Sequence, residues 1–211
     1  MMRNNHAVCC SEAELYSVIP SRWATRNLLL IALFLGAVSV FAREPVSGRF
    51  IRDWQICGPF PAANLLDPAV ENEESLVAGF GRGAGGRPWK VLNAAADHVD
   101  FEAPEAFGLT NQVVAYAFAE LESERDGDVI LGLGSDDGAM AWWNGRQVLV
   151  HDVARGVKAG EDQVRLRMRQ GRNTLLLKVF DAGGGWGFAA DLRPAGAETW
   201  TWKVVPPKTT E

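Results

Sequence analysis

Residues 134–145, with the sequence GSDDGAMAWWNG, concentrate side chains that can bind a ligand. Asp136 and Asp137 are adjacent carboxylates, and carboxylate oxygens are ligands that Ca²⁺ prefers. Trp142 offers a flat apolar surface on which a sugar ring can stack at little entropic cost. A structural interpretation is open for both features, because aspartates bond to their own backbone in turns and a tryptophan can pack beneath a neighbouring loop.

Two polar residues further along the chain extend this candidate site. The guanidinium of Arg155 either holds sugar hydroxyls or pairs with Asp152 or Asp162. Calcium takes about six to eight oxygens, so Asp152, Asp162, Asp181 or backbone carbonyls would have to converge on the aspartate pair. Calcium is therefore the candidate cofactor, with Asp136 and Asp137 as metal ligands, and the predicted ligand-binding residues are Trp142, Arg155 and Asp152.

Catalysis finds little support in the sequence. No Gly-x-Ser-x-Gly motif is present, and neither His98 nor His151 has a second histidine at metal-ligand spacing. Residues 81–86, GRGAGG, match a dinucleotide-binding fingerprint, but Pro88 and Trp89 follow where a helix should begin. We expect no enzyme; the alternative, a small glycoside or ester hydrolase, would need two carboxylates spaced in a deep cleft.

A β-hairpin must position these residues. Asn144-Gly145 lies between two β-like runs, and both residues accept the positive φ of a type I′ turn. Side chains alternate between the faces of a strand, so Ala141 and Trp143 share one face while Met140 and Trp142 share the other. We expect the face of Trp143 to be the core, which leaves Trp142 outward or under a loop.

Short apolar or alternating runs fill the rest of the chain and are separated by glycine, aspartate or asparagine. This pattern predicts an all-β fold, an antiparallel β-sandwich or jelly roll. At most one short helix is expected, beginning at Asp67 and ending near Ala78. A strand over 50–56 should stop at the proline-rich residues 58–61. The downstream strands are predicted at 113–121, 128–133, 139–143, 147–151, 163–168, 174–180 and 187–192, with a closing strand at 200–205.

These motifs resemble the galactose-binding-like jelly-roll modules of exported bacterial glycoside hydrolases and other surface proteins. The resemblance covers roughly residues 49–193, and residues 135–138 followed by Gly145 also resemble the PA14-type β-domain. It implies a jelly-roll fold, and it implies calcium binding by the Asp136–Asp137 pair if the chain acts as PA14-type lectins do. Such modules include sugar binders, calcium-dependent lectins and structural spacers. The residues that carry the resemblance are 54–60, 134–138, 142–145, Arg155, 171–179 and 185–188.

The first residues predict export. Residues 28–41 are apolar and uncharged and follow Arg22 and Arg26, which is typical of the core of a secretory signal. We expect cleavage after Ala42, or alternatively an uncleaved signal anchor that would be the only membrane contact. The expected domains are a signal peptide at 1–42, a β-sandwich at 43–205 and a disordered tail at 206–211, with a secreted, periplasmic or extracellular location.

The net charge and the cysteine count exclude nucleic acid as a partner and an intramolecular disulfide. Without residues 1–42 the chain keeps 18 of its 21 basic and 24 of its 26 acidic residues, a net charge of −6. This balance excludes a basic face for nucleic acid. Cys57 would remain alone, so no intramolecular disulfide can form.

Together these features predict an exported, non-catalytic, carbohydrate-binding module whose partner is a polysaccharide or glycan. The alternative is a structural or protein-interaction module that joins a surface protein in a larger complex. An exposed Trp142 beside a concave polar patch would favour sugar binding. A buried Trp142 would favour the alternative.

Overall fold

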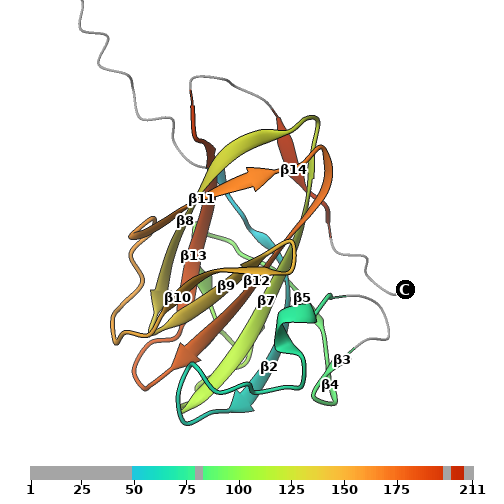
Figure 1. Ribbon diagram of the computed structural model, residues 1–211. Coiled ribbons are helices and arrows are strands. Elements are labelled where there is room, and N and C mark those ends of the chain that lie inside the picture. Colours follow the sequence, from blue (N-terminus) through green and yellow to red (C-terminus); the bar gives the residue numbers. More distant parts are fainter. Residues whose placement is uncertain (1–48, 79–82, 197–200, 207–211) are drawn as a thin grey trace, which may run out of the picture. The chain divides into compact units, whose positions relative to one another are not determined.

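Two antiparallel sheets packed face to face make up the fold (Figure 1). The computed structural model describes residues 49–78, 83–196 and 201–206, which all belong to the unit Pro45–Glu211. The predicted signal segment with its Ala42 cleavage site and residues 207–211 of the predicted tail lie outside the described residues. Within the described ranges, no helix is long and apolar enough to cross a membrane.

The smaller sheet has five strands among the described residues, and β8 and β13 form its centre. β11 is an edge strand of this sheet, since β8 is its one partner in the described chain. The spatial order is β1 (Arg49–Phe50), β13 (Gly187–Pro194), β8 (Gly127–Asp136) and β11 (Asp162–Met168), and β6 (Val99–Asp100) also pairs with β13.

The larger sheet has seven described strands and ends in β10, which pairs with β9 alone in that part of the chain. A small hairpin of β3 (Gly83–Ala84) and β4 (Arg87–Pro88) pairs with neither sheet but contacts β2, where the Cys57 thiol donates to the Arg87 carbonyl at 3.4 Å. The spatial order is β10 (Arg146–His151), β9 (Ala139–Trp143), β12 (Gly171–Asp181), β7 (Val113–Ser123), β2 (Asp53–Pro61) and β5 (Lys90–Asn93), and β14 (Trp202–Val204) pairs with β7.

The predicted antiparallel β-sandwich is therefore confirmed. The seven strands predicted between residues 113 and 192 correspond in order to β7 through β13, and β14 lies within the predicted closing strand. The predicted type I′ turn is present, with φ of 51° at Asn144 and 78° at Gly145. Asn144 also fixes the hairpin to β12, because its side-chain oxygen accepts the backbone N–H of Thr174 at 2.8 Å.

Two local predictions need correction. The helix expected from Asp67 is reduced to one 3₁₀ turn, η1 (Glu73–Ser75), because the Asn64 side chain accepts the backbone N–H groups of Leu66 and Asp67 and makes a turn there. The strand expected to stop at residues 58–61 instead continues as β2 to Pro61. A register shift between Cys57 and Phe60 accommodates the proline, in agreement with the preference of strand prolines for bulges.

The main core lies between the sheets and is built by alternating side chains. Leu131 and Leu133 of β8 meet Phe188 and Leu192 of β13 there, and Trp54 packs edge to face on Phe188 with ring centroids 4.9 Å apart. The burial of Phe188 and of its neighbour Trp186 confirms their predicted core positions.

A second core covers the other face of the larger sheet. Tyr116 and Phe118 of β7 and Phe180 of β12 point to this face and are buried with Leu65 and Val70 of the segment that follows β2. The larger sheet is thus apolar on both faces, and the connecting segment 62–78 forms a third layer over it.

This second core decides the position of Trp142. Alternation along β9 separates the tryptophans as predicted: Ala141 and Trp143 face the main core, and Met140 and Trp142 face the second core. Trp142 is only 3% exposed.

Candidate functional site

Asp136 ends β8 on the outer face of the smaller sheet. It lies opposite Gly187 of β13, and Gly187 lies opposite Asp100 of β6. Opposed residues of an antiparallel pair share a face, and the neighbouring Phe188 points into the core. Asp136 and Asp100 therefore both lie on the outer face, with Cα atoms about 10 Å apart at ordinary strand spacing. Residue 187 must be glycine here, because a Cβ would lie 2.3 Å from the Val99 carbonyl oxygen of β6.

These residues border an open hollow of about 250 Å³, which we call the acidic hollow. Strand β6, the end of β8, the turn before β13 and the loop between β10 and β11 all contribute to its wall. Three of its residues carry carboxylates. The lining residues are His98, Val99, Asp100, Glu102, Asp136, Val157, Gly185, Trp186 and Gly187.

The carboxylate of Asp136 makes no hydrogen bond or ion pair with any described residue. Burial raises its pKa, and the neighbouring charges of Asp137, Asp181 and Glu102 raise it further. The Asp136 carboxylate can occupy this position because residue 185 has no side chain: a Cβ at residue 185 would lie 2.7 Å from Asp136 Oδ2. Asp136 is therefore an acceptor that the fold itself leaves unsatisfied.

Asp137 has a different role, although a single cis peptide bond joins it to Asp136. It is buried, and its Oδ1 accepts the backbone N–H of Arg155 at 3.1 Å while its Oδ2 accepts that of Ala182 at 2.8 Å. The Asp137 side chain thus ties the loop after β10 to the turn after β12. Asp137 therefore has a structural role, but its side chain bonds to the backbone of two distant loops and not to its own turn, as the structural interpretation had it.

Arg155 is engaged in the fold. Its Nη1 donates to Asp162 Oδ1 at 3.2 Å and its Nη2 donates to Asp162 Oδ2, while Nε donates to the Ser135 carbonyl at 3.3 Å. Burial alone would raise the pKa of Asp162, but the hydrogen bonds from Arg155 and His151 outweigh it and lower that pKa. Of the two interpretations of Arg155, the structure shows the ion pair: its partners are the predicted Asp162 and also Glu161, at 3.3 Å.

The remaining predicted ligand residues are separated from the acidic hollow. Trp142 lies in the second core with Leu65 and Phe180, so its ring has no free face for a sugar and the predicted stacking role is wrong. Asp152 is exposed in the loop after β10, and its Cα would lie 3.4 Å from a Cβ on Gly138. Of the residues that the sequence predicts as ligand-binding or metal-binding, Asp136 is the one that lines the acidic hollow.

The predicted calcium site stays a prediction. Asp136 and Asp137 are adjacent, but both oxygens of Asp137 already accept backbone N–H groups. Within the described residues, no group of three or more His, Cys, Asp or Glu side chains is arranged to hold a metal ion. The side-chain donors described thus fall short of the about six to eight oxygens that calcium takes.

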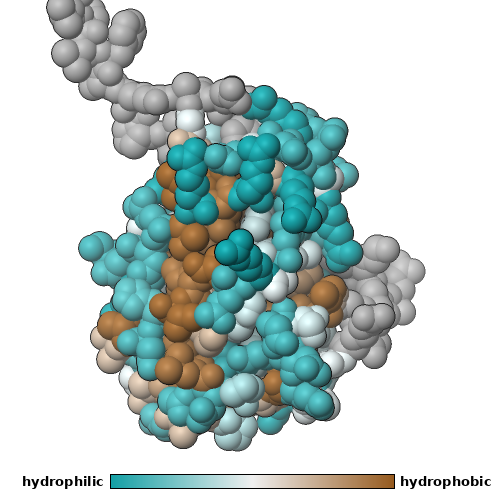
Figure 2. All heavy atoms as spheres, viewed as in Figure 1, coloured by the Kyte–Doolittle hydropathy of each residue, from teal (hydrophilic) through white to brown (hydrophobic). Residues whose placement is uncertain are grey.

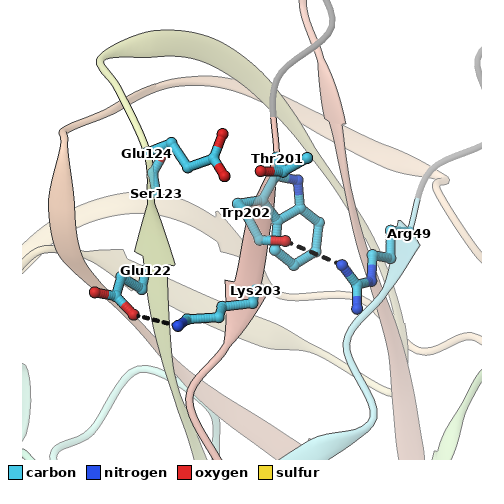
Figure 3. A pocket seen from close by; sticks show the side chains of 7 residues that line it. All are labelled: Arg49, Glu122, Ser123, Glu124, Thr201, Trp202 and Lys203. Atoms are coloured by element: carbon cyan, nitrogen blue, oxygen red, sulfur yellow. Dashed lines mark hydrogen bonds and ion pairs between the residues drawn. The ribbon is translucent and has the colours of Figure 1, made fainter.

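A second hollow, of about 380 Å³, opens where β7 ends and β14 pairs with it (Figure 3). Three of its charged groups have partners among the described residues, and the Glu124 carboxylate has none there. Arg49 donates to the Trp202 carbonyl at 3.0 Å and its guanidinium lies 5.3 Å from the Trp202 ring, while Lys203 pairs with Glu122 at 2.8 Å. This hollow offers a ligand fewer free polar groups than the acidic hollow does.

Sequence reasoning missed Asp100, Glu102 and Gly187. The pattern His98-Val-Asp-Phe-Glu102 does alternate, which places both acids on one face of an extended segment. Nothing in the sequence, however, shows that β6 pairs with the start of β13 beside Asp136.

Comparisons with known proteins show a likeness to several solved structures. No protein-family model and no curated protein matches the chain. The PA14 domain of the antifreeze protein MpAFP matches at 15% identity and a TM-score of 0.44, over 75% of this chain and 92% of that one. The PA14 sugar-binding domain from an RTX adhesin matches at 13% identity and a TM-score of 0.42, over 75% and 96%.

A β-glucosidase from Kluyveromyces marxianus in complex with glucose matches at 16% identity and a TM-score of 0.41. The match covers 52% of this chain, and the chain spans only 15% of the glucosidase. At these identities, and with TM-scores below 0.5, the matches assign no function to this chain.

Proposed function

We propose that this chain is a carbohydrate-binding-like module that holds a sugar in the acidic hollow. The observation that carries the proposal is the Asp136 carboxylate, which has a raised pKa and no partner among the described residues. A sugar hydroxyl donates to a carboxylate and adds no charge, so it satisfies Asp136 without displacing a cation.

The form of the hollow supports a small polar ligand. Its volume of about 250 Å³ lies below the roughly 300–1,000 Å³ of sites for drug-sized ligands, which suits a single sugar ring. Asp100 and Glu102 add further acceptors. Few hydrogen bonds and little apolar area give weak binding, with a Kd of about 1 mM for one sugar unit.

The proposal includes export and the absence of catalysis. The apolar run 28–41 behind Arg22 and Arg26 supports export through a signal segment. The open form of the acidic hollow supports a non-catalytic role, since glycoside hydrolysis needs two carboxylates on opposite sides of an enclosed substrate bond.

A glycan array tests the proposal. The protein as expressed should bind a subset of glycans, and Asp136→Asn should abolish this binding without lowering Tm. The matched control is Asp126→Asn, because Asp126 is an exposed acid just before the other end of β8, about 30 Å from the hollow. It should bind as the parent protein does. No glycan binding, or equal binding by Asp136→Asn, would refute the proposal.

A calcium chelator arm tests the metal prediction separately. Binding that survives the chelator and is lost in Asp136→Asn supports direct recognition by the carboxylate. Binding that the chelator abolishes and that calcium restores would instead show that recognition depends on a calcium ion.

The burial of Trp142 favours a second candidate, a structural or protein-interaction module. A protein of this class gives no signal on the glycan array and still binds a protein partner. Its interaction surface would have to lie elsewhere on the sandwich.

A further inference from the structure

An open groove separates the edge strands of the two sheets. β10 is the edge of the larger sheet and β11 is the edge of the smaller one, and neither pairs with a further strand among the described residues. The space between them measures about 460 Å³, and we call it the edge groove. It is lined by Trp143, Asn144, Arg146, Gln147, Val148, Val164, Arg165, Leu166, Arg167 and Arg169.

The floor of the edge groove is apolar. Val148 of β10 and Val164 of β11 are half-buried, and Leu166 and Trp143 beneath them belong to the main core. Figure 2 shows an apolar stripe over the face on which β10 and β11 lie, between hydrophilic margins. A partner that enters the groove therefore extends the core of the sandwich and removes apolar surface from water.

The margin of the groove is positively charged, although the whole chain has a net charge of −5. Four of the ten lining residues are arginines, and none is acidic. Arg165 and Arg167 pair with Asp128, at 2.8 and 3.2 Å. The guanidinium groups of Arg146 and Arg169 make no ion pair or hydrogen bond with any described residue. These two cations are free for an anionic partner.

The edge strands β10 and β11 differ in how regularly each could pair with an added strand. β10 carries a register shift between Gln147 and Leu149, and such a bulge interrupts a regular ladder. β11 pairs with β8 residue by residue from Asp162 to Met168, so its other edge has a regular strand geometry, and the Arg167 carbonyl accepts the indole N–H of Trp143 at 3.0 Å. An added strand would therefore pair with β11.

We propose that the edge groove binds an extended, acidic segment of a partner protein by strand addition to β11. The backbone of the segment pairs with the free edge of β11, and its alternate apolar side chains meet Val148 and Val164 on the floor. Its carboxylates reach Arg146 and Arg169, whose planar guanidinium groups bind carboxylates in bidentate geometry. This interaction uses a surface separate from the acidic hollow and does not depend on sugar binding.

The alternatives fit the groove less well. A second copy of the chain would bring one arginine-lined edge against another, and like charges across an interface disfavour association. An anionic polysaccharide would satisfy Arg146 and Arg169, but it has no backbone that can pair with β11 and no side chains for the apolar floor.

A synthetic peptide tests the proposal on the whole protein. The probe is a fluorescein-labelled peptide of about ten residues that alternates valine and glutamate, long enough to pair with all of β11. Fluorescence anisotropy should show saturable binding, and a valine–lysine peptide should not bind. The double variant Arg146→Glu/Arg169→Glu should weaken binding about tenfold or more, because both free cations are reversed.

Arg172→Glu is the matched control, because Arg172 is an exposed arginine of β12 that pairs with Glu120 and does not line the groove. It should bind the valine–glutamate peptide as the parent protein does. Bound peptide should also slow amide hydrogen exchange in residues 162–168 and leave residues 202–204 unchanged, since strand addition protects the amides of the edge strand alone.

Three results would overturn the proposal. One is a valine–glutamate peptide that does not bind, or that binds equally well to Arg146→Glu/Arg169→Glu. Another is equal binding of polyglutamate or dextran sulfate without protection of residues 162–168, which would show attraction by charge alone. The third is a concentration-dependent dimer that the double variant dissociates, which would make a second copy the occupant. Asp136→Asn should leave peptide binding intact, so failure here is distinct from failure of sugar binding.

Discussion

Lys178 Nζ lies 2.9 Å from Glu73 Oε2, and both side chains are buried on the outer face of the larger sheet. The Tyr116 hydroxyl donates to the same carboxylate oxygen at 2.6 Å, and Lys178 also donates to the Asp67 carbonyl at 2.7 Å. The buried lysine thus has an anion and a carbonyl as acceptors, and the buried carboxylate has a cation and a hydroxyl as donors. The network fastens the segment 62–78 onto strands β7 and β12.

Removal of Lys178 should therefore destabilise the protein strongly. Lys178→Met leaves the Glu73 carboxylate buried without a cation, and we expect the free energy of unfolding to fall by about 3–5 kcal/mol. The double variant Lys178→Met/Glu73→Leu should recover most of this loss, because no buried charge remains unpaired. Urea unfolding followed by tryptophan fluorescence measures both values.

The control for this prediction is Lys203→Met, which removes an exposed lysine from its surface pair with Glu122. A surface pair of this kind contributes about 0–1 kcal/mol, so the control should unfold nearly as the parent protein does. A loss below about 1 kcal/mol in Lys178→Met would show that segment 62–78 does not depend on the ion pair.

The same network makes stability depend on alkaline pH through Tyr116. Burial raises the pKa of Tyr116 above its usual value of 10.0, and its hydrogen bond to Glu73 raises it further. The folded state thus keeps the phenol proton where the unfolded state loses it. The stabilisation is fully present below pH 10 and is lost above it, by about 1.4 kcal/mol per pH unit.

Tyr116→Phe isolates this contribution from the other groups that titrate at alkaline pH. The variant should show a shallower fall of the free energy of unfolding between pH 10 and 11 than the parent protein. Parallel curves for the two proteins would contradict the raised pKa of Tyr116.

The hairpin of β9 and β10 could be predicted from the sequence because its determinants are local. Asn144-Gly145 fixes the turn, and alternation along five residues assigns Trp143 to one face and Trp142 to the other. The core positions of Trp186 and Phe188 followed from the same alternation.

The second core could not be predicted in this way, because it depends on contacts far apart in the chain. Lys178 reads as an outward residue of a strand, and its partner Glu73 lies 105 positions earlier. One signal was present: residues 113–119 of β7 are apolar at every position, which indicates a strand buried on both faces. That signal predicts a covering layer over Tyr116 and hence the burial of Trp142.

Only part of the candidate site was open to sequence reasoning for the same reason. Asp136 stands out in its motif, but Asp100 belongs to a two-residue strand whose partner is set by the tertiary fold. The adjacent Asp136 and Asp137 also look equivalent in the sequence. The structure separates them through two backbone N–H groups that come from distant loops.

This separation gives opposite expectations for two neighbouring substitutions. Asp137→Asn offers one acceptor to two N–H donors, so it should lower the free energy of unfolding by about 1–3 kcal/mol. Asp136→Asn should raise Tm at pH 7, because the raised pKa means that the fold disfavours the charged form of Asp136.

The pH dependence checks the reason for the Asp136 effect. The ionised carboxylate of Asp136 lowers the stability of the folded state at pH values above its raised folded pKa. This loss of stability disappears as the pH falls through that pKa toward 3.8, the usual pKa of an aspartate. The Tm difference between Asp136→Asn and the parent protein should therefore vanish near pH 3. Thermal melts from pH 3 to pH 8 measure it, and a difference independent of pH would contradict the electrostatic explanation.

Gly185→Ala should remove sugar binding without removing the fold. The new Cβ would lie 2.7 Å from Asp136 Oδ2, and the carboxylate must move because side-chain atoms yield more easily than backbone. The backbone at Gly185 lies outside the left-handed region, so alanine is conformationally allowed and should change stability by less than about 1 kcal/mol. The matched control is Gly196→Ala, whose Cβ would meet nothing within 4 Å. Glycan binding lost in Gly185→Ala and kept in Gly196→Ala, at similar Tm, would locate the ligand at Asp136; binding kept in both would place it elsewhere.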